Sequence, residues 1–117
     1  MSAVAAAERT PETAGVLDAS LCHGAIGVGH IFNRLAQTTG ETRLAEAARF
    51  WLLRGLAMRR PAGRLGGFHA VMMGEDGQPA RRVVFRGLLM GAAGIGLALL
   101  AATSDAEPSW DRILLLS

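Results

Sequence analysis

The 117-residue sequence contains one cysteine, no lysine and few aromatic residues. A single cysteine excludes an internal disulfide framework, so the chain suits a reducing compartment or a metal site, and the cytoplasm is its expected location. The twelve basic side chains are all arginine, and ten acids leave a net charge of +2. Because few aromatic residues accompany these arginines, the pattern predicts no nucleic-acid binding. Charged residues make up 19% and hydrophobic residues 50%, a composition that excludes wholesale disorder and predicts an ordered fold.

The sequence also lacks a segment long enough to span a membrane. Its longest candidate, the uncharged run Gly87 to Ala102, has sixteen residues, fewer than the ~20 that a bilayer requires. Residues 1–19 lack the basic and leucine-rich regions of a signal peptide. We therefore expect this segment to be a tail or the end of a preceding helix.

A glycine-rich motif occurs twice. The segment GAIGVG at 24–29 recurs as GAAGIG at 91–96, an offset of 67 residues, which indicates an internal repeat. Each copy opens an apolar segment, 23–38 and 88–103, and both segments are predicted to be helices buried on nearly all sides. Glycine disfavours helix by about 1 kcal/mol relative to alanine. Its matched spacing therefore predicts a close backbone approach to a neighbour or ligand.

The residues between the two copies predict a helix followed by a long connection. An amphipathic pattern covers 42–60, with arginine and glutamate outward and Leu44, Ala47, Ala48, Trp51, Leu52 and Leu56 inward. We expect this outer helix to cover an inner one. Residues 61–86 are rich in glycine and arginine, and Asp76-Gly77 favours a turn or hairpin within them.

The adjacent Cys22 and His23 are the most chemically specific residues of the chain. Thiolate and imidazole are preferred zinc ligands, and neighbours in sequence reach one ion only where the backbone turns sharply. The equivalent positions of the second copy are Leu89 and Met90, so the pair is additional to the repeat. A buried cysteine beside an unrelated histidine is the alternative. His30 lies two turns, about 10 Å, beyond His23, which favours a packing or polar role, and His69 is expected at the surface.

The stretch Leu21-Cys22-His23-Gly24, followed by Gly27 and an apolar helix, resembles the cysteine-histidine motif of lanthionine synthetase C-like cyclases. Residues 87–100 and 110–116 resemble the closing repeat and C-terminus of that family. The resemblance implies an all-α fold, a partial (α/α) toroid whose glycine-rich inner helices are covered by amphipathic outer helices, with residues 20–117 forming two C-terminal repeats. It also implies that Cys22 and His23 bind zinc, together with a cysteine of a preceding repeat and a substrate thiol.

The implied activity is addition of peptide cysteine thiols to dehydroalanine or dehydrobutyrine, which forms thioether rings in a precursor peptide. No segment of the sequence matches the family's acid-base histidine, so the catalytic residues stay unassigned. Two repeats of a toroid would leave apolar flanks exposed, which predicts that upstream repeats come from a partner protein, a longer chain or a homo-oligomer. The alternative is a non-catalytic helical interaction or scaffold module derived from the same family.

Overall fold

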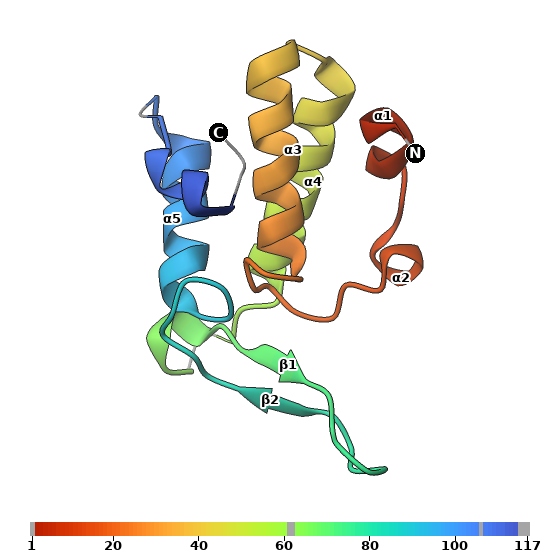
Figure 1. Ribbon diagram of the computed structural model, residues 1–117, viewed down its shortest axis with the longest axis vertical. Coiled ribbons are helices and arrows are strands. Elements are labelled where there is room, and N and C mark those ends of the chain that lie inside the picture. Colours follow the sequence, from red (N-terminus) through yellow and green to blue (C-terminus); the bar gives the residue numbers. More distant parts are fainter. Residues whose placement is uncertain (1, 61–62, 106, 115–117) are drawn as a thin grey trace.

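The computed structural model describes residues 2–60, 63–105 and 107–114 and is mostly helical (Figure 1). The expected all-α class is confirmed, and a two-stranded hairpin is the only sheet among the described residues. The elements in chain order are α1 Ala3–Ala7, α2 Pro11–Ala14, α3 Ala25–Thr39, α4 Thr42–Ala57, the 3-10 helix η1 Leu65–Gly67, β1 Ala70–Met72, β2 Arg81–Val83, α5 Ala92–Thr103 and the 3-10 helix η2 Ser109–Leu114.

Helices α3 and α4 form an antiparallel pair joined by a tight turn at Gly40. This glycine has a φ of +70°, and its N–H donates to the Ala36 carbonyl oxygen at 2.8 Å, which ends α3. The predicted inward positions Leu44, Ala47, Ala48 and Trp51 of α4 are buried against α3. Leu56 was expected to face inward but is 41% exposed, because Gly55 is the residue at the end of α4 that faces Ile26.

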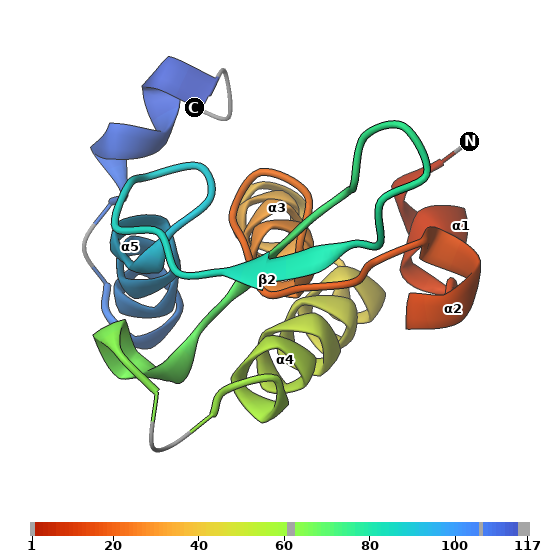
Figure 2. The ribbon, with the colours of Figure 1, turned by 90° about the horizontal axis from the view of Figure 1, so that it is seen from below.

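Helix α5 lies on the other side of α3 and begins at the same end of the molecule (Figures 1 and 2). Ile95 and Ala98 of α5 pack against Leu21 and Ile26. The expectation that α5 is buried on nearly all sides is wrong, because its Leu100 is 63% exposed. Of the helices in the described part of the chain, α3 alone packs extensively against α5. No helix within that part is both long enough and apolar enough to cross a bilayer.

The predicted turn in the connection is a β-hairpin. Strands β1 and β2 pair antiparallel with Ala70 opposite Val83, and the turn residues Asp76 and Gly77 both have positive φ. Positive φ at two successive positions is typical of a tight hairpin turn. The hairpin lies at the end of the molecule where α3 and α5 begin (Figure 1). At the N-terminus, α1 packs against α4.

Candidate metal centre

The turn that precedes α3 holds Cys22 and His23 outside the helix. Helix α3 begins at Ala25 with Gly24 as its N-cap, two residues later than the expected start at His23. The Ser20 carbonyl oxygen accepts from Gly24 N–H at 2.9 Å, and the Asp18 carbonyl oxygen accepts from Ala25 N–H at 2.8 Å. A Cβ at position 24 would overlap Ser20 N, so the turn requires glycine there.

A buried carboxylate, that of Asp18, organises this turn. Its Oδ1 accepts hydrogen bonds from Ser20 N–H at 3.0 Å and from Ser20 Oγ at 2.8 Å. Its Oδ2 accepts from Val71 N–H at 2.7 Å, which connects strand β1 to the turn. His23 Nδ1 lies 3.5 Å from Asp18 Oδ1. Asp18 therefore influences both the backbone of the turn and the orientation of the His23 ring.

Both predicted ligands are accessible to solvent. Cys22 is exposed as a free thiol, and the side chain of His23 is 48% exposed. This exposure disagrees with the alternative of a buried, inert cysteine. Within residues 2–60, 63–105 and 107–114, no group of three or more histidine, cysteine, aspartate or glutamate side chains could hold a metal ion. Metal ligation by Cys22 and His23 therefore stays a prediction.

The second copy of the repeat builds the same kind of turn beside the first. Gly91 is the N-cap of α5, as Gly24 is of α3, and both have an extended backbone. A Cβ at Gly27 would overlap the Leu21 carbonyl oxygen, and one at Gly94 would overlap that of Leu88. These glycines confirm the predicted close backbone approach. The two turns also contact each other, because Cys22 N–H donates to the Leu89 carbonyl oxygen at 2.8 Å.

A small apolar cavity adjoins the exposed thiol. Its volume is about 240 Å³, and it is lined by Leu21, Cys22, Gly27, His30, Ile31, Leu89 and Leu114. These residues come from the α3 turn, from α3 itself, from the α5 turn and from η2. The cavity therefore forms only when both repeats and the C-terminal segment pack together.

Sequence reasoning missed a buried cluster that holds η2 against α3. Asp111 is 0% exposed, and its Oδ2 lies 3.0 Å from His30 Nε2 and 2.9 Å from Arg34 Nε. The His30 ring also stacks on Trp110, with centroids 4.8 Å apart. Burial lowers the pKa of His30, and the hydrogen bond to Asp111 opposes this effect only in part. The expected packing or polar role of His30 is confirmed.

The remaining predicted and observed features lie apart from this turn. His69 was expected at the surface but is half-buried, and its Nδ1 is buried without a hydrogen-bond partner among the described residues.

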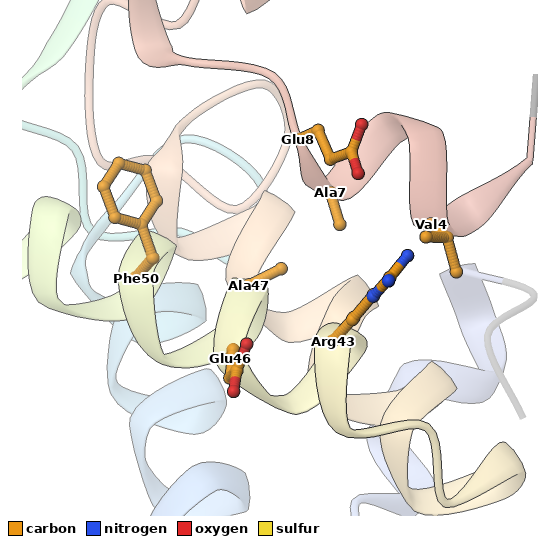
Figure 3. A pocket seen from close by; sticks show the side chains of 7 residues that line it. All are labelled: Val4, Ala7, Glu8, Arg43, Glu46, Ala47 and Phe50. Carbon is orange, nitrogen blue, oxygen red and sulfur yellow. The ribbon is translucent and has the colours of Figure 1, made fainter.

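A groove of about 450 Å³ between α1 and α4 is lined by Val4, Ala7, Glu8, Arg43, Glu46, Ala47 and Phe50 (Figure 3). This groove includes neither predicted ligand. Leu115 and Leu116, part of the stretch that resembles the C-terminus of the lanthionine synthetase C-like family, lie outside the described residues.

Comparison with known proteins agrees with the resemblance seen at Cys22-His23. The search of curated proteins finds no significant match. The search of solved structures finds none either. The family model described as lanthionine synthetase C-like protein matches residues 2–115, nearly the whole sequence. The chain therefore belongs to the lanthionine synthetase C-like protein family.

Proposed function

We propose that this chain is the zinc-bearing C-terminal part of a lanthionine-forming cyclase, with Cys22 and His23 as two of the metal ligands. The observation that carries the proposal is the exposure of a thiol and an imidazole on adjacent residues of a glycine-dependent turn. Membership of the lanthionine synthetase C-like family supports the same conclusion.

The two predicted ligands, Cys22 and His23, suit zinc. Cysteine sulfur and histidine nitrogen are typical zinc donors, and a metal-binding histidine usually has its other ring nitrogen against a carboxylate or carbonyl. The Nδ1 atom of His23 faces the buried Asp18 carboxylate at 3.5 Å, which leaves Nε2 for a ligand. A tetrahedral site needs two more donors. In this proposal a side chain of an upstream repeat and the substrate thiol supply them.

Zinc in such a site would lower the pKa of a bound substrate thiol, so that a thiolate nucleophile exists near neutral pH. The peptide sulfur then bonds to the β-carbon of a dehydroalanine or dehydrobutyrine, and the α-carbon takes up a proton. Cys22 and His23 fix the position of the site, and the apolar side chains Leu21, Ile31 and Leu89 line the cavity beside the thiol. The acid that delivers the proton lies outside this pair, in the upstream repeats that complete the toroid.

Zinc analysis of the purified chain, alone and with a segment carrying the upstream repeats, tests the proposal. We expect about one zinc per complex and loss of that zinc in Cys22→Ala and His23→Ala. His69→Ala is the matched control, because His69 belongs to the connection and is expected to leave zinc binding intact. Retention of stoichiometric zinc by Cys22→Ala in the complex would refute the assignment.

A non-catalytic helical interaction module is the second candidate. The observation that favours it is the exposure of large apolar side chains on helices, including Leu53 of α4 and Leu100 of α5. Such a module would assemble with a helical partner in fixed stoichiometry without taking up metal. The same zinc analysis separates the two candidates, because only the cyclase requires an ion held by Cys22.

A further inference from the structure

A second cavity, which we call the arginine cavity, lies between the end of α4 and the β-hairpin. Its volume is about 400 Å³. Its lining includes Arg54, Arg59 and Arg60 from α4 and the residues after it, and His69 and Arg82 from the hairpin region. These side chains are up to 28 residues apart in sequence. The fold therefore gathers positive charge that the sequence disperses.

Neighbouring acids offset this positive charge only in part; outside the lining, Glu12 interacts electrostatically with Arg54. Asp18 is the only acidic residue that lines the cavity, and its carboxylate already accepts hydrogen bonds from Ser20 and Val71. None of the four lining arginines forms a salt bridge within the part of the chain that the structure describes. Arg59 alone among them has a side-chain hydrogen bond there, from Nε to the Gly66 carbonyl oxygen at 2.7 Å.

An unsatisfied polar atom accompanies the arginines. His69 lines the cavity, and its Nδ1 is buried without a hydrogen-bond partner among the described residues. A buried ring nitrogen in that state is costly unless a ligand or water satisfies it. Guanidinium groups from two elements beside such a nitrogen are suited to carboxylate oxygens, which accept two parallel N–H bonds from each arginine.

We propose that the arginine cavity binds the carboxylates of an acidic segment of the peptide substrate, an inference that rests on the proposed cyclase function. The four arginines present several separate forks, which fits a chain of carboxylates better than a single small anion. Asp18 connects the two sites, because it lines the arginine cavity while its Oδ1 lies 3.5 Å from His23 Nδ1. A peptide held by the arginines therefore runs beside the turn that carries Cys22 and His23.

Fluorescence anisotropy with a labelled glutamate-rich peptide, and with its glutamine counterpart, tests this inference on the full chain. We expect the glutamate peptide to bind and the double variant Arg54→Gln/Arg82→Gln to weaken it at least about tenfold, the effect of losing charged hydrogen bonds. The control Arg43→Gln/Arg49→Gln removes equal charge from exposed positions of α4 outside the cavity. It should change the affinity less than about twofold, because neither arginine lines the cavity and an exposed charge outside the site contributes little.

Three outcomes would overturn the inference. Equal weakening by both double variants would mean a general attraction to positive charge. Binding of the glutamine peptide as tight as that of the glutamate peptide would remove the role of carboxylates. Full displacement by inorganic phosphate at the same concentration as the peptide would identify a small-anion site instead.

The Cys22→Ala variant separates this inference from the proposed function. It removes a predicted zinc ligand and leaves the arginine cavity intact, so it should bind the glutamate peptide as the unmodified chain does. Failure of the unmodified chain to bind zinc with its upstream repeats, while selective peptide binding is retained, counts against the proposed function. Loss of the arginine dependence with zinc binding retained counts against this inference alone.

Discussion

Two buried carboxylates connect α3 to distant segments of this chain. Asp18 does so at the start of the helix and Asp111 at its second turn. Asp18 accepts from Val71 N–H across 53 residues, and Asp111 contacts His30 across 81 residues. The sequence does not reveal either connection, because each aspartate lies in a turn-like context where an exposed side chain is the ordinary expectation. By contrast, the adjacent Cys22 and His23 were identified from the sequence because their chemistry is local.

The burial of His30 predicts a stability that falls in acid. Burial lowers the pKa of His30 in the folded chain, below its unfolded value of about 6.5. The unfolded chain therefore binds a proton first as the pH falls below about 6.5, and the free energy of unfolding decreases by up to about 1.4 kcal/mol per pH unit. Above that pH the histidine is neutral in both states, and this contribution to stability is complete.

Urea unfolding at pH 7.5, 6.5 and 5.5 checks this prediction. The His30→Gln variant lacks the titrating group, so the slope of its stability against pH should be smaller than that of the unmodified chain. Arg34 and Asp111 are the charged groups that face His30, and both are present in the variant. Parallel pH profiles for the two proteins would contradict the prediction.

Asp111→Asn tests the same cluster from the acidic side. The amide preserves the size of the side chain but removes the charge that faces Arg34 Nε at 2.9 Å in a buried position. We expect a loss of about 3 to 5 kcal/mol in the free energy of unfolding, the range for breaking a buried ion pair. Glu107→Gln is the control, because its contact with Arg112 is exposed and 4.0 Å long, and it should change stability by less than about 1 kcal/mol. Urea unfolding measures both variants. Equal losses in the free energy of unfolding would mean that burial does not strengthen the Asp111 ion pair.

At the scale of elements, two apolar segments and one amphipathic pattern predicted the three long helices, and the errors in their bounds lie at their ends. The apolar segments begin at 23 and 88, but α3 and α5 begin at Ala25 and Ala92 because the preceding residues form the glycine turns. Helix α4 ends at Ala57 rather than near Arg60, and Arg60 N–H donates instead to the Gly67 carbonyl oxygen at 2.8 Å. Such hydrogen bonds outside helices depend on tertiary packing, which periodicity does not encode.

Two glycines of α5 give a matched test of the repeat. A Cβ at Gly94 would overlap the Leu88 carbonyl oxygen, whereas a Cβ at Gly96 meets no atom within 4 Å. Gly94→Ala should therefore destabilise the chain by about 1 to 3 kcal/mol through overpacking of the turn. Gly96→Ala should stabilise it by up to about 1 kcal/mol, because alanine favours helix at an open position.

Thermal unfolding monitored by circular dichroism measures both glycine variants in the same helix. The midpoints should move in opposite directions relative to the unmodified chain. A shift of the same sign and size would mean that helix propensity, rather than the contact with Leu88, decides the effect of a side chain at these positions.

For the whole molecule, the cavity beside Cys22 shows why the site was only partly predictable. Its walls come from both repeats and from η2, so no single stretch of sequence contains it. The repeat itself was recognisable in the sequence, and it indicated that the two glycine-rich segments are structurally equivalent. Their direct contact through Cys22 N–H and the Leu89 carbonyl oxygen is a property of the assembled fold. The surroundings of the thiol therefore depend on the packing of α5 against α3.

The exposed face of α5 predicts self-association of the isolated chain. Leu100 is 63% exposed on a helix without charged residues, a surface that a partner or a second copy would cover. Leu100→Gln should reduce the association constant by at least about tenfold, because burying one leucine contributes about 1.5 to 3 kcal/mol. Sedimentation velocity over a range of concentrations measures this change. Met73→Gln is the control: Met73 is 73% exposed, but it lies between β1 and the hairpin turn, away from α5. If both variants weaken association equally, non-specific hydrophobic contact rather than the α5 face drives the association. In that case α5 is not the surface on which upstream repeats would pack.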